Sequence, residues 1–410
     1  MRDDERGMVL ARWLGGERAL ALDGALVVLS AERLCRHVLV CGATGSGKTE
    51  TLLRLAWTLA RSGEGQVFYL DGKGDRDTAR RFVGLMADAG RRARVFPNEA
   101  FDGWRGAGHE IQGRLMEIVE HVRQGPAAWY GDIARNVVRL VCEHPDGPPR
   151  SSESVLERME HRALRRAHGD SSALETLSAT QVKQVRLRYE AFFGQTRGAL
   201  DGDWAWEDTT AGYLLLDSLA LREETSGLAR LLFEDFGHYF TARKTRERLC
   251  VLIVDEFGAL AGSTSMAARV EQARGFRTGL VLAPQVVQGM GSQAEVARIL
   301  GSVETVICHR VNTPEEIVGL AGTRRRIEYS PRYTSDGVSR EGTTQLRERP
   351  KIDANDVRRL PPGQAYLISH GRAMRGQILQ APNLHGELPA SAPRRSPTTT
   401  LGASPKPLPF

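Results

Sequence analysis

The chain has little of what marks secreted, metal-binding or membrane-spanning proteins. Its five cysteines are scattered, with no C-x-x-C pair, so they indicate small core residues in a reducing compartment and no metal site. The best apolar stretch, Ala19–Leu29, is eleven residues long and is interrupted by Asp23 and Gly24, which is too short for a membrane span. Nothing long and apolar follows the opening MRDDER, so no signal peptide is indicated. These absences predict a cytosolic protein.

Lysine is also scarce, with six lysines against fifty arginines. The net charge is +6, so arginine supplies nearly all of the positive charge. This balance permits a nucleic-acid partner without establishing one, because a GC-rich genome also enriches arginine. The length of 410 residues suits one large α/β domain with an inserted or appended second domain.

One of the few lysines stands in the most informative segment, which fits G-x-x-x-x-G-K-[ST]. The strand-length run His37–Cys41 precedes it, and Glu50–Arg61 follows with apolar residues at helical spacing. In that setting glycines let backbone N–H groups surround an anion, and the helix adds its positive end. The alternative is a glycine-rich turn without a ligand. The predicted nucleotide-binding residues are Gly42, Ala43, Thr44, Gly45, Ser46, Gly47, Lys48 and Thr49.

Within this P-loop, Lys48 is expected to reach the β- and γ-phosphates of ATP, and Thr49 to ligate Mg²⁺. The run Leu249–Glu256 is the strongest buried strand in the sequence and ends in two acids, as a Walker B motif does. Asp255 would hold Mg²⁺, and Glu256 would orient and deprotonate the attacking water. Capping of the next helix by these carboxylates is the alternative.

Three further polar positions join the prediction. Gln285 follows the strand Gly279–Ala283 and is placed to sense the γ-phosphate or the attacking water, or else satisfies loop backbone. Arg274 and Arg277 precede that strand, where in ring-shaped ATPases a residue can reach the neighbouring subunit's γ-phosphate. The alternative is that both are solvated surface arginines. The sequence does not show which of the two arginines would act on the neighbouring subunit.

The turn Asp71-Gly72-Lys73-Gly74-Asp75 ends another buried strand. Its charged residues Asp71, Lys73 and Asp75 are expected on the ligand side of an open sheet, near the nucleotide or on the substrate path. A tight glycine turn without further function is the alternative. The basic tract 324–349 also has two interpretations, as a DNA-facing loop or as a solvated hairpin.

Strands alternate with helices along most of the chain, which predicts an α/β fold with a mostly parallel sheet, here of the RecA-like P-loop type. Between about Trp104 and Thr209 strand signals are rare, and helical patterns such as Ser152–Ala167 predict an inserted all-helical domain. The predicted organisation is a β-rich entry at 1–36, a motor domain at 37–103 and 210–387, a helical insertion at 104–209 and a disordered tail at 388–410.

Together these segments resemble the TraD/TraG-type coupling-protein ATPases of conjugation and type IV secretion, within the superfamily of FtsK and HerA. The resemblance spans about residues 25–385. It rests on the segments His37–Val40, Asp71–Asp75, Tyr213–Leu219, Val254–Phe257, Gln272–Gly275, Ala283–Gln285 and Leu360–Ala365. Gly72 stands where the family commonly has proline.

This resemblance implies Mg²⁺-dependent ATP hydrolysis by a hexameric ring, DNA passing through a central pore, and a helical domain that contacts a relaxase. Family members usually begin with transmembrane helices, which this sequence does not show. A separate membrane-anchoring partner at the inner face of the cell membrane would reconcile the two. The alternatives are a soluble HerA-like DNA translocase of a mobile element or defence system, an ATPase for secretion-channel assembly, and a nucleotide-gated protein-docking module.

Overall fold

The computed structural model describes residues 8–16, 21–22, 26–63, 65–118, 128–169, 171–216, 222–243, 248–256, 266–334 and 337–390. Within these residues, twelve strands form one sheet in the order β2-β3-β1-β14-β13-β10-β4-β9-β8-β5-β7-β6. The strands are β1 Met8–Gly16, β2 Ala21–Leu22, β3 Leu26–Leu29, β4 Val38–Cys41, β5 Gly65–Asp71, β6 Ala93–Phe96, β7 Ala211–Leu215, β8 Leu249–Asp255, β9 Thr278–Ala283, β10 Thr305–Cys308, β13 Gln364–Ser369 and β14 Arg372–Ile378.

The seven strands from β10 to β6 are all parallel, and the antiparallel strands β13, β14, β1, β3 and β2 extend the sheet on one side. The α/β, mostly parallel fold predicted from the sequence is confirmed. Strands β4, β8, β9 and β10 are buried along their whole length, as a parallel sheet covered on both faces requires.

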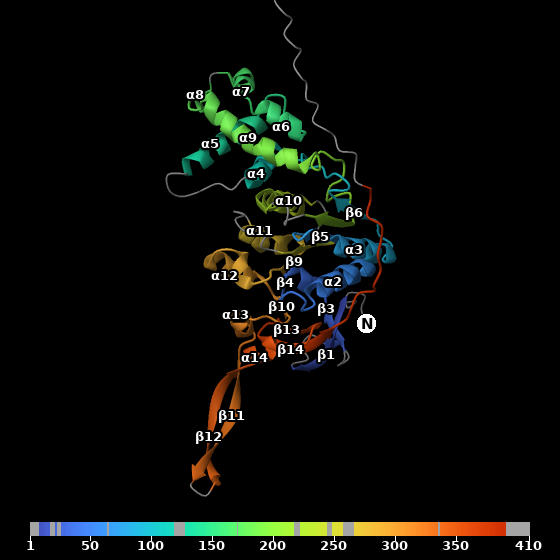
Figure 1. The fold of residues 1–410 in the computed structure, drawn as a ribbon, viewed down its shortest axis with the longest axis vertical. Coiled ribbons are helices and arrows are strands. Elements are labelled where there is room, and N and C mark those ends of the chain that lie inside the picture. Colours follow the sequence, from blue (N-terminus) through green and yellow to red (C-terminus); the bar gives the residue numbers. More distant parts are fainter. Residues whose placement is uncertain are drawn as a thin grey trace, which may run out of the picture.

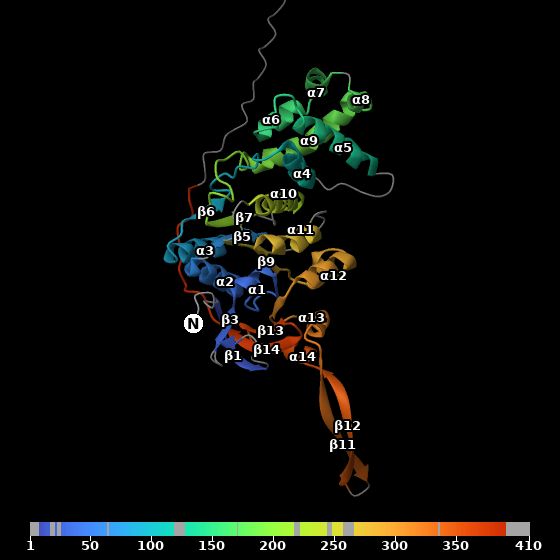
Figure 2. The ribbon, with the colours of Figure 1, turned by 180° about the vertical axis from the view of Figure 1, so that it is seen from behind.

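Helices cover both faces of this sheet (Figures 1 and 2). Helices α2 (Lys48–Ser62) and α3 (Arg76–Asp88) lie on one face, and α10 (Arg222–Ala242) and α11 (Met266–Ala273) on the other. Strand β8 supplies both cores, because successive side chains of a strand alternate between faces. Its Val251 and Ile253 pack with α2 and α3, whereas Leu252 and Val254 pack on the side of α10. Shorter helices beside this sheet are α1 Ala31–Cys35, α12 Gln293–Ser302, α13 Glu315–Gly319 and α14 Ala354–Arg358, with short 3₁₀ turns η4 Arg274–Phe276 and η5 Val287–Met290.

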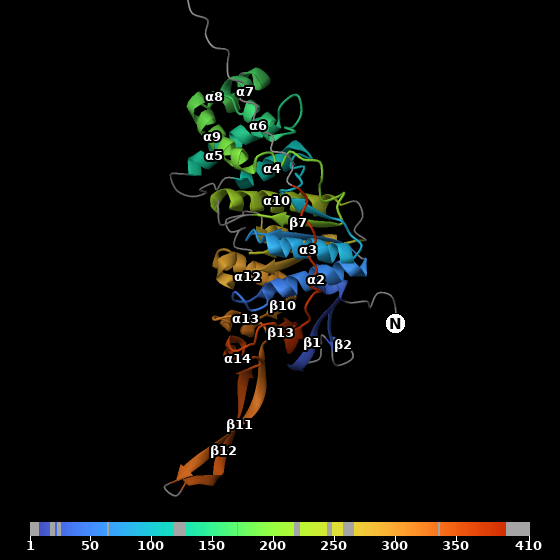
Figure 3. The ribbon, with the colours of Figure 1, turned by 45° about the vertical axis from the view of Figure 1, so that its right-hand side comes forward.

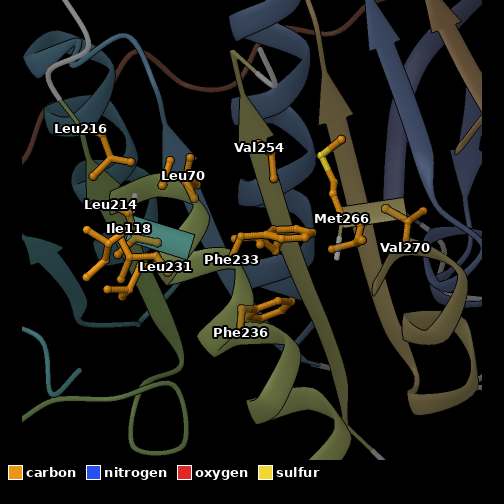
Figure 4. Packing of buried hydrophobic residues seen from close by; sticks show 14 of the residues in the cluster. Leu70, Ile118, Leu214, Leu216, Leu231, Phe233, Phe236, Val254, Met266 and Val270 are labelled. Atoms are coloured by element: carbon orange, nitrogen blue, oxygen red, sulfur yellow. The ribbon is translucent and has the colours of Figure 1, made fainter. Parts of the chain in front are cut away.

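A helical region follows β6 and packs on α10 (Figure 3). It contains α4 Gly108–Ile118, α5 Ala128–Cys142, α6 Ser152–Arg158, α7 His161–His168, α8 Ser172–Glu175 and α9 Ala179–Thr196. Figure 4 shows Phe233 and Phe236 of α10 over the sheet, with Ile118 of α4 beside Leu231. The core of this region is therefore continuous with the core on one face of the sheet.

A buried ion pair joins α4 to α10, and a neutral hydrogen bond joins α9 to α4. The buried guanidinium of Arg114 on α4 donates to Asp235 of α10 at 2.6 Å and to the carbonyl of Gly103 at 2.9 Å. The hydroxyl of Tyr189 on α9 donates to the carbonyl of Leu115 at 2.9 Å. Such fully partnered buried groups are costly to disrupt, so α4 holds the helical region firmly on α10.

Several sequence expectations need adjustment. The helix expected over Ser152–Ala167 is divided into α6 and α7, with Glu160 in extended conformation between them. Strand β1 lies within residues 1–36, where the sequence predicts a β-rich entry, and β14, which the sequence did not predict, joins β1 to the rest of the sheet. Three parts of the sequence predictions lie outside the described residues. They are Asp217–Leu219 of the segment that begins at Tyr213, Phe257 after the two acids of β8, and the predicted tail from residue 391 on.

The chain between α13 and α14 forms a separate two-stranded hairpin of β11 (Thr323–Thr334) and β12 (Gly337–Pro350). It projects from the end of the molecule opposite the helical region (Figures 1 to 3). The basic tract 324–349, which the sequence left as either a loop or a hairpin, therefore forms a hairpin. Among the described residues, no helix is both long enough and apolar enough to cross a membrane.

Candidate nucleotide-binding and hydrolysis site

The P-loop connects β4 to α2, as the sequence predicts for a strand–loop–helix motif. Its geometry needs glycine: Gly45 and Gly47 have φ values of 73° and 109°, in the left-handed region. At Gly42 an added Cβ would lie 2.8 Å from Cβ of His309 and closer still to Oγ of Ser46. A side chain at Gly42 would therefore displace the P-loop from its contacts with His309.

That support comes from His309, at the end of β10, and from the turn at Gly363–Gln364. Nδ1 of His309 donates to the carbonyl of Gln364 at 3.0 Å, and Nε2 lies 2.8 Å from the hydroxyl of Thr51 on α2. The N–H of Gly363 donates to the carbonyl of Ser46 at 2.9 Å. Burial lowers the pKa of His309 to about 4, so the ring is neutral and Nε2 accepts from Thr51.

The sequence did not single out His309, although it did single out the segment Leu360–Ala365. The structure gives that segment a physical role, because its turn at Gly363 lies against the P-loop at Gly47. Only the register of β10 beside β4 brings His309 under the loop.

Lys48 begins α2 and is buried, with 6% of its surface exposed. Its ammonium donates to the carbonyl of Pro284 at 3.2 Å, at the tip of β9. Burial lowers the pKa of Lys48, and the positive charge of Lys73 acts in the same direction. Strand β9 lies between β4 and β8, so the tip of β9 faces both the P-loop and the Walker B carboxylates.

Glu256 follows β8 in a left-handed conformation, with φ of 63°. A non-glycine residue there carries strain of about 1–3 kcal/mol and persists only when its surroundings hold it. Here the side-chain amide of Gln285 donates to Oε2 of Glu256 at 2.9 Å, and the N–H of Glu256 donates to Oδ1 of Asp255 at 3.0 Å. The structure thus brings Glu256 and Gln285 into direct contact.

Asp255 is buried and has two side-chain partners. The hydroxyl of Tyr69 donates to Oδ2 at 3.0 Å, and the ammonium of Lys73 lies 3.3 Å from Oδ1. The same ammonium lies 3.9 Å from Oε2 of Glu256. Lys73 therefore bridges the two Walker B carboxylates across neighbouring strands β8 and β5.

The other two charged residues of the D-G-K-G-D turn have local roles. Asp71 is buried and accepts from the hydroxyl of Tyr213 at 2.8 Å and from the N–H groups of Lys73 and Asp75, each at 2.8 Å. Burial raises the pKa of Asp71 to about 6, against the effect of these hydrogen bonds. Asp75 caps α3 by accepting from the N–H of Asp77 at 2.9 Å.

Arg274 and Arg277 lie at the opposite edge of the sheet. Both are exposed, and the carbonyl of Arg277 accepts from the N–H of Cys250 at the start of β8. The P-loop and Walker B carboxylates lie at the carboxyl ends of the strands, whereas these arginines lie at the amino ends. Neither can therefore reach the site of its own chain.

The arrangement fits a bound nucleotide and Mg²⁺ on two observations. The buried Oγ of Ser46 has no hydrogen-bond partner among the described residues, and a cradle at Gly42 and Gly47 leaves no room for a Cβ. Thr49, half-buried beside Lys48, and Asp255 carry the oxygen ligands that Mg²⁺ prefers. These residues would hold the metal and the phosphates.

Comparison with solved structures decides the fold. The conjugative coupling protein TrwBdeltaN70 matches with a TM-score of 0.66 at 17% identity, covering 95% of this chain and 96% of that chain. The chain has the coupling-protein fold. TrwB in complex with ADP and Mg²⁺ also gives a TM-score of 0.66, at 15% identity over 93% of this chain and 97% of that one. VirB4 of Thermoanaerobacter pseudethanolicus gives 0.61 at 14% identity, covering 92% of this chain and 98% of that chain.

Sequence comparisons agree with this coupling-protein fold and with the resemblance inferred above. Residues 19–93 match the family model "Helicase HerA-like C-terminal". The type 4 coupling protein DotL of Legionella pneumophila is 42% identical over 111 residues, which are 27% of this chain and 14% of DotL. An uncharacterised protein of Mycoplasma pneumoniae is 31% identical over 102 residues, covering 23% of this chain and 67% of that protein. The chain thus spans a small part of DotL's length.

Proposed function

We propose that this chain is an ATP-hydrolysing motor of the coupling-protein type, which uses Mg-ATP to move DNA in conjugation or type IV secretion. One observation carries the proposal. Lys48, Asp255, Glu256 and Gln285 converge at the carboxyl ends of three adjacent strands, and Glu256 is already held by the Gln285 amide at 2.9 Å. The coupling-protein fold supports the same assignment.

In the proposed reaction the P-loop amides and Lys48 bind the β- and γ-phosphates of ATP. Thr49 and Asp255 would hold Mg²⁺, which would neutralise charge on the phosphate oxygens. Glu256 accepts a proton from the attacking water, and its strained backbone and Gln285 fix the carboxylate in one orientation.

Arg274 and Arg277 complete the site from a second copy. Because they lie at the far edge of their own sheet, either can act only on the nucleotide of a neighbouring subunit, as a homo-hexameric ring provides. Within this proposal the helical region 104–209 contacts a relaxase or another protein substrate, and a separate partner anchors the ring at the membrane.

The test is ATP turnover by the purified protein, with and without single- and double-stranded DNA. We expect DNA to stimulate turnover, and Glu256→Gln to reduce it by about 10²- to 10⁴-fold while nucleotide binding is retained. Lys48→Ala should instead weaken nucleotide binding. Turnover that neither DNA changes, with no DNA binding at low salt, would rule out the DNA part of the proposal and redirect it to a protein-assembly ATPase.

A further inference from the structure

The β11–β12 hairpin has two chemically different faces. In an antiparallel pair, residues directly opposite each other share a face, and successive residues alternate. Arg324 is paired with Arg349, and two residues further along Arg326 is paired with Arg347. Four exposed arginines thus lie together on one face, with Glu328 as the acidic residue among them.

The opposite face of the same stretch carries one exposed apolar pair and no net charge. Ile327 is paired with Leu346, and their exposed fractions are 68% and 61%. The neighbouring pair on this face is Arg325 with Glu348, which balance each other's charge. The positive charge of the hairpin is therefore concentrated on the arginine face, defined by Arg324, Arg326, Arg347 and Arg349.

Glu328 offsets only part of this charge. It forms two hydrogen bonds to the guanidinium of Arg349, one of them at 3.0 Å, and lies 3.8 Å from Arg347. Exposed ion pairs of this kind contribute little stability, so the arginines are not explained as supports of the hairpin. Four arginines against one glutamate leave a surface suited to an anionic partner.

The base of the hairpin is anchored to the motor. The N–H of Lys351 donates to the carbonyl of Gly322 at 3.0 Å, where the two strands leave the body. An ion pair between Arg358 of α14 and Glu315 of α13 joins the flanking helices, and Arg358 also donates to the carbonyl of Asn312 at 3.1 Å. Helix α14 then leads to Gly363, which donates to the P-loop.

We propose that the arginine face of the β11–β12 hairpin binds the phosphate backbone of double-stranded DNA. A two-stranded ribbon fits the major groove of B-DNA, and guanidinium groups form paired hydrogen bonds with phosphate oxygens. The two arginine rows are two residues apart, about 7 Å, which matches the rise of about two base pairs along the axis of B-DNA. This inference rests on the proposed DNA-handling function and assigns it a contact surface outside the nucleotide site.

The test measures binding of the full-length chain to a fluorescently labelled DNA duplex by anisotropy, from about 50 to about 200 mM salt. The variant Arg324→Gln/Arg326→Gln/Arg347→Gln removes three charges from the arginine face. Neutralising a phosphate contributes about −0.9 to the slope of log affinity against log salt, so this slope should become shallower by about 3. Basal ATP turnover without DNA should not change.

Two matched variants separate charge from hairpin integrity. Arg324→Lys/Arg326→Lys/Arg347→Lys keeps the charge and should keep most of the salt dependence. Ile327→Ser/Leu346→Ser changes only the apolar pair on the opposite face and should bind DNA as the intact chain does. Excision of 324–349 at the Gly322–Lys351 closure, with a short turn in its place, should reproduce the glutamine variant even if the glutamines disturb the ribbon.

Distinct results would overturn the proposal. If the intact chain binds DNA and the glutamine and excision variants retain its salt slope, the hairpin does not contact DNA, and the proposed motor function stands. If Ile327→Ser/Leu346→Ser alone changes assembly of the chain, the hairpin docks a protein instead. If the intact chain hydrolyses ATP but does not bind DNA at low salt, both this contact and the DNA part of the proposed function fail.

Discussion

Mild acid should destabilise this protein through two buried histidines, His37 and His309. Burial lowers the pKa of each to about 4, against an ordinary value of 6.5. Each ring is neutral and has a partner at both nitrogens: Nε2 of His37 donates to Val270 and Nδ1 accepts from the N–H of Leu280, at 2.8 and 3.1 Å. Protonation inside the fold is therefore unfavourable, whereas the unfolded chain protonates freely.

The sign and size follow from linkage between protonation and folding. A base with a lowered folded-state pKa contributes stability that is present above about pH 6.5 and is lost as the pH falls towards 4. Going from about pH 7.5 to about pH 5 should cost about 2 kcal/mol for each of the two histidines. Asp71 acts in the opposite direction: its pKa is raised to about 6, so the same acidification returns about 1.4 kcal/mol.

Because these contributions oppose each other, the informative quantity is the difference between variants. Urea unfolding, followed by tryptophan fluorescence and circular dichroism, gives the free energy of unfolding at each pH if both probes report one transition. His37→Asn suits the left-handed backbone at φ of 63° and cannot ionise, and His309→Gln likewise cannot ionise. Each variant should be less stable at pH 7.5 yet lose about 2 kcal/mol less on acidification than the intact chain.

The reasoning would be refuted if both single variants lost as much stability between the two pH values as the intact chain. The buried rings would then not be the groups that couple protonation to folding. If only His309→Gln lost less stability on acidification, protonation of His309 beneath the P-loop would be the event that couples pH to folding. In that case ATP binding should weaken over the same pH interval.

Three further changes test the site and its frame. Gln285→Ala removes a hydrogen bond to the Glu256 carboxylate worth about 1.5–3 kcal/mol, so ATP turnover should fall about 10- to 150-fold in steady-state assays, with nucleotide affinity unchanged. Gly42→Ala has no room for its Cβ and should weaken nucleotide binding at least about tenfold by calorimetry. The control Gly301→Ala lies in open space on α12. It should bind nucleotide normally, and its free energy of unfolding should be about 0.5–1 kcal/mol higher. Arg114→Met leaves a buried carboxylate of α10 without its cation and should cost about 3–5 kcal/mol in urea unfolding.

The parallel part of the fold could be predicted because its signals are local. Strand β8 is a continuous apolar run that ends in two acids, and the P-loop glycines mark the start of α2. The antiparallel strand β14 lacked such a signal. Strand β14 contains two arginines and a glycine. Its alternation of buried and partly exposed side chains is explained only by its pairing with β13 and β1.

The sequence predicted only those site residues that belong to a recognisable local motif. His309 stands alone after an apolar run, and its role depends on Thr51 and Gln364, which are distant in the sequence. The division between α6 and α7 has no proline or glycine to mark it. The two faces of the hairpin depend on strand register, which pairs Arg324 with Arg349 and could not be derived from the basic composition of the tract.

The D-G-K-G-D turn lies directly beside the two carboxylates of the candidate hydrolysis site. Asp71 and Asp255 are paired in register at the ends of β5 and β8, so their like charges need separate partners. Each accepts from its own tyrosine, and the rings of Tyr69 and Tyr213 are stacked with centroids 4.9 Å apart. Lys73 directs its ammonium to Asp255 and Glu256, so Asp71 is held by the Tyr213 hydroxyl and two backbone N–H groups, and burial raises its pKa. Asp71 therefore anchors the turn, and the turn presents Lys73 to the carboxylates that the proposed reaction uses.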